Sequence, residues 1–206
     1  MRGYGYYLFD MDNTIVDSSM GFEIAYRTAF EEFGMDYDPS RYNEYIATPL
    51  DVLFAKYYPG CTCRYRDFAS LVISTYDRHY TESVRLFPDA ERCIRTLRER
   101  GGKIGIVSNS YDQHINGIMR FLGVDDCFDA IVGLETSPVE KPNPYPVRLC
   151  MSKLGAIPED TIMIGDSKND IFAGSGAGIE TALISRCGDY PPCTPTYRIS
   201  DLGEIL

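Results

Sequence analysis

Residues 10–14 (DMDNT) are the segment of this sequence whose residue types and spacing most clearly indicate chemistry. The segment has two carboxylates at alternate positions and directly follows a short apolar run at residues 6–9. One carboxylate of such a pair can attack phosphorus and form an acyl phosphate, which divides one difficult hydrolysis into two easier steps. The other can protonate the leaving oxygen and later take a proton from water. Asp10 and Asp12 therefore indicate phosphoryl transfer chemistry, although a surface turn rich in Asp and Asn has the same composition.

Two further polar segments also follow short apolar runs. Ser108 and Asn109 come after residues 104–107, where a hydroxyl and the free N–H groups of a beginning helix suit phosphate oxygens. Lys141 stands between Glu140 and Pro142 ahead of a helical pattern, where it could neutralise a phosphate and nearby carboxylates. Taken alone, the Ser fits a helix cap and the Lys fits a solvated surface charge.

Asp166 and Asp170 follow a fourth apolar run, residues 161–164. If a helical turn starts there, the spacing of four residues places both carboxylates on one face. Their mutual repulsion favours a bound cation, and an all-oxygen ligand set that includes a substrate phosphate suits Mg²⁺ better than zinc or calcium. We therefore expect Mg²⁺ as the cofactor.

The elements that must position these residues are short, β-branched apolar runs that alternate with helical patterns. Runs of this kind are typical of strands covered on both faces, and the alternation predicts an α/β fold with a doubly wound parallel sheet. The predicted strands are residues 6–9, 104–107, 130–133, 161–164 and 181–184. Each polar segment follows a different strand at its carboxyl end, which is where such sheets bind ligands. This joint placement carries the functional prediction.

One stretch interrupts the alternation. Roughly ninety residues separate the first two strands, far more than a usual crossover connection. Apolar stripes at helical spacing run through residues 22–33 and 68–79. We expect a helical cap domain at residues 18–85, inserted into an α/β core of residues 1–17 and 86–206. The Pro-containing segment 187–196 is expected to be irregular.

Together these motifs resemble the haloacid dehalogenase superfamily, in particular its phosphoglycolate phosphatase-like and β-phosphoglucomutase-like branch, with its Rossmann-like core. The resemblance implies that Asp10 is the nucleophile and Asp12 the general acid and base, whose backbone carbonyl also meets the metal. Residues 47–50 look like the substrate loop of the family's cap. Asn13 departs from the pattern, since Gly commonly stands there. The implied substrate-binding residues carry hydroxyl, amide or ammonium groups: Thr14, Thr48, Ser108, Asn109 and Lys141. The implied Mg²⁺ site consists of aspartates: Asp10, Asp12, Asp166 and Asp170, the last binding directly or through water.

The leading hypothesis is a Mg²⁺-dependent phosphatase that hydrolyses a small phosphorylated metabolite through an aspartyl phosphate. A sugar-phosphate mutase would use the same aspartates with a sugar hydroxyl in place of water. Carbon–halogen hydrolysis is disfavoured by Asp12, because that reaction has no leaving oxygen to protonate. The alternative that is not an enzyme is a non-catalytic phosphate-binding protein.

The charge of the chain narrows the choice of partners. Its 206 residues include 20 Lys and Arg against 30 Asp and Glu, for a formal charge of −10. Such a field repels nucleic acid and anionic membranes, and it requires a metal or a local Lys to attract a phosphate. No apolar run is long enough to span a bilayer, and residues 1–5 lack the apolar segment of a signal peptide. We expect a cytoplasmic monomer or homodimer.

Overall fold

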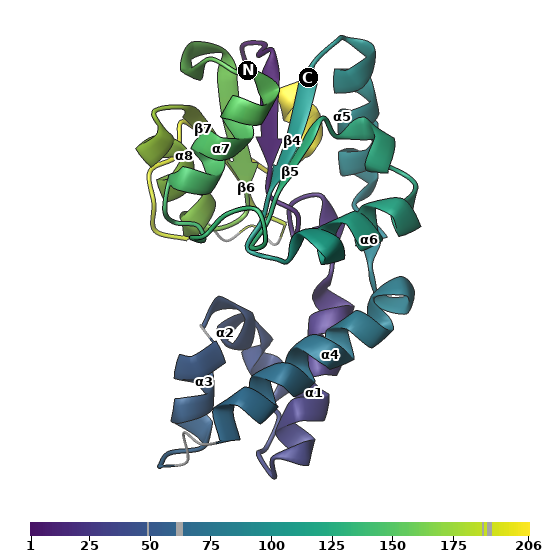
Figure 1. Cartoon of the computed structure of the whole chain (residues 1–206), viewed down its shortest axis with the longest axis vertical. Helices are drawn as coiled ribbons and strands as arrows, with labels where there is room; N and C mark the ends of the chain where they lie inside the picture. The colour runs from purple at the N-terminus through teal and green to yellow at the C-terminus, as the bar shows by residue number, and fades with distance from the viewer. Residues whose placement is uncertain (49, 61–63, 187, 189–190) are drawn as a thin grey trace. The chain divides into compact units, whose positions relative to one another are not determined.

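The computed structural model describes residues 1–48, 50–60, 64–186, 188 and 191–206. The chain divides into two compact units (Figure 1). The first, which we call the core unit, combines Met1–Asp17 with Arg85–Leu206, and the second, the helical unit, consists of Ser18–Val84. Each unit is described below by itself.

A six-stranded sheet forms the centre of the core unit, and every neighbouring pair of its strands is parallel. The strand order is β5-β4-β1-β6-β7-β8. The parallel sheet and its five predicted strands are confirmed, whereas β8, which follows the Pro-containing segment, was not predicted. The strands are β1 (Tyr6–Phe9), β4 (Lys103–Val107), β5 (Ala130–Val132), β6 (Thr161–Gly165), β7 (Glu180–Ile184) and β8 (Tyr197–Ile199).

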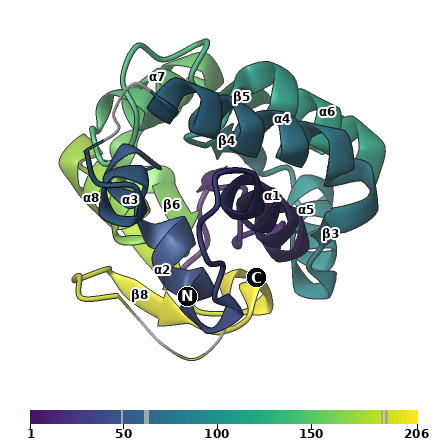
Figure 2. The same cartoon turned by 90° about the horizontal axis from the view of Figure 1, so that it is seen from below.

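Helices cover both faces of this sheet. Figures 1 and 2 show α5 (Pro88–Glu99) and α6 (Asp112–Leu122) on one side of the strands, and α7 (Tyr145–Leu154) and α8 (Lys168–Ala177) on the other. The first helix of the core unit after β1 and the helix after β6 thus lie on opposite faces. In an open α/β sheet this reversal leaves a crevice at the carboxyl ends of the two strands. Short 3₁₀ turns complete the unit: η3 (Asp125–Cys127), η4 (Pro158–Asp160) and η5 (Leu202–Ile205).

A two-stranded antiparallel ribbon connects the core unit to the helical unit. Its strands are β2 (Val16–Asp17) and β3 (Arg85–Leu86), with Val16 paired to Leu86. The backbone N–H of Phe87 extends the pairing by donating to the Ile15 carbonyl at 3.1 Å. Two-residue strands carry no periodicity, so the sequence did not predict the ribbon. The helical unit therefore leaves and rejoins the core unit at adjacent points.

The helical unit folds around an aromatic core of its own. Phe30, Tyr45 and Phe68 are fully buried, and the ring centroids of Phe30 and Tyr45 are 5.0 Å apart. The first and last helices pack closely at Gly21, where a Cβ would lie 2.8 Å from the Tyr76 ring. Aromatic burial on this scale supplies the main stabilisation of a small helical unit. Its elements are α1 (Ser19–Glu32), η1 (Pro39–Arg41), α2 (Tyr42–Ala47), α3 (Leu50–Tyr57) and α4 (Tyr65–Ser83).

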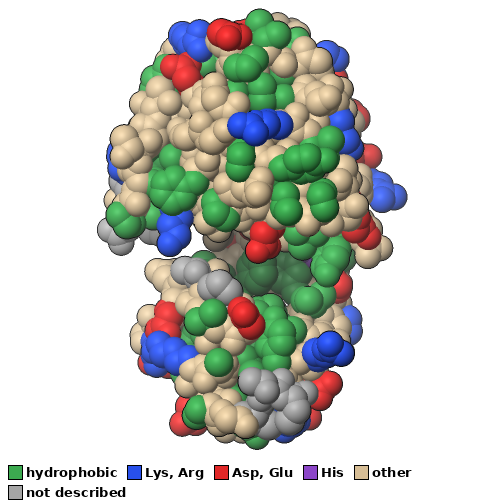
Figure 3. All heavy atoms as spheres, turned by 60° about the vertical axis from the view of Figure 1, so that its left-hand side comes forward, with side chains coloured by type: hydrophobic (Ala, Val, Ile, Leu, Met, Phe, Trp, Pro, Cys, Tyr) green, Lys and Arg blue, Asp and Glu red, His purple; other side chains and the backbone are tan. Residues whose placement is uncertain are grey.

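Within the described residues, every helix is too short or too polar to cross a membrane. On the face shown in Figure 3, Lys and Arg side chains lie scattered among acidic ones.

Asp112, in the first turn of α6, ties the end of β4 to the segment after β5. Its carboxylate accepts hydrogen bonds from the backbone N–H groups of Gly133 at 3.1 Å, Glu135 at 2.8 Å and Thr136 at 2.9 Å. Gly133 is required at this point, because a Cβ there would lie 2.5 Å from the Ser110 carbonyl. The polar residues that follow these two strands are thereby held in register.

We predict that Asp112→Asn lowers the free energy of unfolding at neutral pH by about 1 kcal/mol, because an amide is a weaker acceptor and the site is partly solvated. Burial by itself raises the pKa of Asp112, but the bonds from Thr136, Gly133 and Glu135 lower it below its ordinary value. A depressed carboxyl pKa gives stability that is complete above the unfolded value, about 3.9, and is lost as pH falls through the folded value.

The stability difference between wild type and Asp112→Asn should therefore shrink as the pH falls below about 4. Urea unfolding at neutral and acid pH measures it, with the exposed Asp125→Asn as the control. A difference that stays constant across this range would contradict the role assigned to the carboxylate.

Candidate active site

A buried ion-pair network joins three segments that are far apart in the sequence. The ammonium nitrogen of Lys141 lies 2.6 Å from Asp10 Oδ1, 2.6 Å from Asp170 Oδ1 and 2.6 Å from the Val107 carbonyl oxygen. Asp10 is 8% exposed, Lys141 is 3% exposed and Asp170 is fully buried. Asp10 extends β1, with its backbone N–H donating to the Ile164 carbonyl of β6 at 2.8 Å. The network therefore lies at the switch point between β1 and β6.

The turn after β1 holds the second oxygen of Asp10. Thr14 is fully buried, and its hydroxyl donates to Asp10 Oδ2 at 3.1 Å. Asn13 adopts the left-handed conformation with φ 56°, and its backbone N–H donates to Val16 at 2.8 Å. Asn adopts this conformation more readily than most residues other than Gly. Asn13 is thus compatible with the turn, although the resemblance led us to expect Gly there.

Ser108 and Asn109 follow β4, as the sequence predicted, and Asn109 fixes the backbone of Lys141. The Asn109 side-chain amide donates to the Lys141 carbonyl at 2.9 Å, while the Lys141 N–H donates to Asn109 Oδ1 at 2.8 Å. Ser108 is 5% exposed, and its hydroxyl oxygen accepts from the backbone N–H of Ser110 at 3.1 Å. The structure thus brings Ser108, Asn109 and Lys141 together.

Ser110 is a residue of this site that the sequence analysis missed. Its hydroxyl donates to Asp12 Oδ2 at 3.2 Å, so it orients the carboxylate expected to act as acid and base. Its position directly after Ser108 and Asn109 was the available signal.

The segment after β6 differs from the prediction that Asp166 and Asp170 lie on one helical face. Helix α8 begins at Lys168 with Ser167 as its N-cap, so Asp166 precedes the helix. Asp170 completes a capping box, accepting from the Ser167 backbone N–H at 3.1 Å and from its hydroxyl at 2.6 Å. Gly165 permits this packing, since a Cβ there would lie 2.3 Å from the Asp170 carboxyl carbon. The capping preference of Ser decides where the helix starts.

Burial perturbs the ionisation of these groups. It raises the pKa of Asp10 to about 7, even though the Lys141 charge acts to lower it. Burial likewise raises the pKa of Asp166 well above its ordinary value, and the charges of Asp10 and Asp170 add to the effect. For Lys141, burial by itself lowers the pKa, but the two carboxylates outweigh it and hold the ammonium charged. The site therefore has more negative charge than its one Lys neutralises.

The donor set fits a hard divalent cation. Among the described residues, Asp10, Asp166 and Asp170 each offer a carboxylate oxygen, and these atoms lie within 4.8 Å of one another. When all three carboxylates are ionised, they carry two more negative charges than the one ammonium neutralises, and a divalent cation would balance that excess. Carboxylate oxygens that leave room for water and a phosphate oxygen are what Mg²⁺ requires.

Thr48 belongs to the helical unit, at the C-terminal end of α2. Its hydroxyl donates to the Glu44 carbonyl at 2.7 Å. Of the expected substrate loop at residues 47–50, Pro49 lies outside the described residues.

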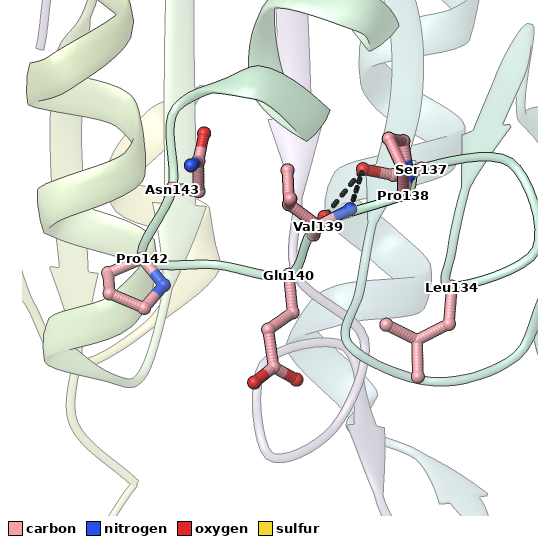
Figure 4. A pocket seen from close by; sticks show the side chains of 7 residues that line it. All are labelled: Leu134, Ser137, Pro138, Val139, Glu140, Pro142 and Asn143. Carbon is pink, nitrogen blue, oxygen red and sulfur yellow. Dashed lines mark hydrogen bonds between the residues drawn. The ribbon is translucent and has the colours of Figure 1, made fainter.

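The loop that carries Lys141 also forms a shallow surface pocket, which Figure 4 shows from close by. Ser137 pins the loop, because its hydroxyl donates to the Val139 carbonyl at 2.5 Å and accepts from the Val139 N–H at 3.4 Å. Lys141 is not among the lining residues, so this pocket is separate from the buried network. The lining residues are Leu134, Ser137, Pro138, Val139, Glu140, Pro142 and Asn143.

Comparisons with known proteins agree with one another. Residues 7–184 match the family model described as haloacid dehalogenase-like hydrolase. The chain is 30% identical over 208 residues to a phosphoglycolate phosphatase of Aquifex aeolicus, covering 97% of this chain and 95% of that protein. It is 30% identical over 212 residues to pyrophosphatase PpaX of Halalkalibacterium halodurans, covering 97% and 94%. The crystal structure of a protein described as a haloacid dehalogenase-like hydrolase, from Bacteroides fragilis, matches with a TM-score of 0.86 at 28% identity, covering 98% of this chain and all of that one.

We predict that Mg²⁺ stabilises the protein more strongly at high pH than at low pH. A carboxyl whose folded pKa is raised makes the metal-free fold less stable as pH rises from about 4 through about 7, because the buried group must ionise. Asp10 has this property. Mg²⁺ needs the ionised form, so its stabilisation should grow over the same window, reaching about 2.7 kcal/mol at a hundredfold excess over Kd.

Thermal unfolding with and without Mg²⁺, at about pH 5.5 and about pH 8, tests this dependence. Asp166→Asn should lose most of the Mg²⁺ effect, whereas Asp125→Asn should keep it. An equal Mg²⁺ shift in wild type and Asp166→Asn would remove Asp166 from the metal site.

Proposed function

Because the chain belongs to the haloacid dehalogenase-like hydrolase family, we propose that it is a Mg²⁺-dependent phosphatase that hydrolyses a small phosphorylated metabolite through an aspartyl phosphate on Asp10. The observation that supports this most directly is the contact of Lys141 with both Asp10 and Asp170 at 2.6 Å. The Lys141 charge lowers the pKa of Asp10 against the larger effect of burial, and the ammonium is placed to offset the charge of an incoming phosphate.

In the first step an Asp10 oxygen attacks phosphorus, the bond from phosphorus to the leaving oxygen breaks, and Asp12 gives that oxygen a proton. In the second step Asp12 takes a proton from water, the water oxygen attacks phosphorus, and the phosphorus–Asp10 bond breaks. Inorganic phosphate leaves, and both aspartates return to their starting states. Ser110 fits this cycle because its hydroxyl donates to Asp12 Oδ2 and so orients the carboxylate that would transfer the proton.

The remaining residues orient the phosphoryl group and the nucleophile. Ser108 and the backbone of Asn109 would bind phosphoryl oxygens, and Thr14 fixes the Asp10 rotamer through its 3.1 Å bond. Asp10 and Asp166 would hold Mg²⁺, together with the Asp12 carbonyl, while the fully buried Asp170 orients Lys141 and Ser167. Bound Mg²⁺ would supply Lewis-acid stabilisation of charge on the phosphoryl oxygens.

The helical unit would serve as the cap that selects the substrate, with Thr48 as a contact. Small anionic substrates are the first to test, because the relatives carry the names phosphoglycolate phosphatase and pyrophosphatase. A mutase would use the same core residues, with a sugar hydroxyl as the acceptor. Release of inorganic phosphate separates the two reactions.

We predict that the wild-type protein releases inorganic phosphate from p-nitrophenyl phosphate and from 2-phosphoglycolate or pyrophosphate only when Mg²⁺ is present. Asp10→Asn should lower kcat by about a thousandfold or more, because the nucleophile is lost. Acid quenching during turnover, followed by peptide mass analysis, should find one phosphoryl group on the peptide that contains Asp10.

The matched control is Asp125→Asn, which removes an exposed carboxylate in η3 and should leave kcat unchanged. Isomerisation of β-glucose 1-phosphate without release of phosphate would replace the phosphatase assignment with a mutase. Wild-type kcat in Asp10→Asn would refute the covalent mechanism.

A further inference from the structure

Arg186, two residues beyond β7, connects segments of the core unit that are remote in sequence. One guanidinium nitrogen donates to Asp89 Oδ2 at 2.7 Å, and another donates to the Thr14 carbonyl. The guanidinium carbon lies 3.9 Å from the ring centroid of Phe87, which places the group over the ring face. The Arg186 side chain is 16% exposed and that of Asp89 is 9% exposed. Contacts of this kind, shielded from water, are stronger than surface ion pairs.

The residues that Arg186 contacts lie where the two strands of the ribbon join the core unit. Thr14 lies two residues before β2, and Phe87 directly follows β3. Thr14 is also the residue whose hydroxyl bonds to Asp10. Thr14 therefore contacts both Arg186 and the nucleophile close to the point where the chain enters the ribbon.

We propose that Arg186 is a positioning residue that holds the turn of residues 10–14 fixed where the helical unit is attached. The proposal rests on the proposed function in treating Asp10 as the nucleophile. Arg186 anchors the Thr14 carbonyl, Thr14 orients Asp10, and Asp89 anchors Arg186 on the other side. Displacement of a reacting group by about 1 Å can slow catalysis by about a hundredfold, so one lost anchor has a measurable effect.

The chemistry of Arg is required at this position. Its planar guanidinium presents donors in several directions and stacks on an aromatic ring, so one group serves Asp89, Thr14 and Phe87 together. A Lys has the charge but gathers its donors on one compact ammonium, which does not present a flat face to stack on the ring while it reaches both acceptors. Asp89 also accepts from the Leu202 N–H at 2.8 Å, which fixes its carboxylate against the C-terminal segment.

Three variants separate positioning from stability. Arg186→Lys keeps a positive charge opposite Asp89, so it should stay folded but lower kcat for p-nitrophenyl phosphate by about tenfold, with KM changed less than about twofold. Arg186→Met combined with Asp89→Asn removes the ion pair without leaving a buried charge, and it should show the same loss of kcat. Arg92→Ala is the matched control, because Arg92 is an exposed residue of α5 paired with Asp201 at 3.4 Å, and its kcat should equal that of wild type.

Hydrogen exchange supplies a readout that needs no substrate. The backbone N–H groups of Asn13, Ile15 and Phe87 bond within the turn and the ribbon. They should exchange about tenfold faster in both Arg186 variants, while the amides of the central strand β6 keep their wild-type rates. Arg92→Ala should leave all of these rates unchanged.

Wild-type kcat together with wild-type exchange at these amides, in variants that remain folded by circular dichroism, would overturn the proposal. Faster exchange throughout the core unit would also overturn it, because it indicates a general loss of stability. If the wild-type protein hydrolyses no phosphate ester, the proposed function fails, and the exchange measurement still decides whether Arg186 holds the turn.

Discussion

The core unit depends on one buried cation placed between two buried carboxylates. Transfer of an ion pair from water into a protein interior usually carries a desolvation penalty that its mutual attraction barely offsets. Lys141 offsets this penalty through three contacts at 2.6 Å, two with carboxylates and one with the Val107 carbonyl of β4. Hydrophobic residues of similar size would pack there without this desolvation penalty. The presence of this buried ion pair is therefore better explained by chemistry than by stability.

The order of strands in the sheet makes that contact possible. β1 lies between β4 and β6, so Asp10, the Val107 carbonyl and the segment that carries Asp170 emerge side by side. Lys141 comes from the loop after β5, and Asn109 fixes its backbone by two reciprocal hydrogen bonds. Each group is thus supported by a regular element or by a paired amide, which is how a site keeps its geometry while it carries unneutralised charge.

The sequence predicted what depends on local pattern and failed where tertiary contacts decide. Buried parallel strands appear as short apolar runs, so five strands and the polar segments after them could be recognised. The ribbon of β2 and β3 is too short to have a period, and β8 is a short strand at the edge of the sheet after a segment rich in Pro. The condition that a helical turn starts at Asp166 is not met, because Ser167 is the N-cap of α8 and Asp166 precedes the helix. Arg186 had no motif at all, since its importance arises from residues that are about a hundred or more positions away.

The same core chemistry can deliver a phosphoryl group to water or to a sugar hydroxyl, so the choice of acceptor has to come from elsewhere in the chain. The helical unit is suited to supply it because it has its own aromatic core and is joined to the core unit through one short ribbon. Under the proposed function, substitutions in the helical unit would change which substrate is accepted without altering the contacts of Lys141. That independence has one physical requirement, which is that the attachment point must not move the nucleophile. A buried guanidinium at the base of the ribbon meets this requirement.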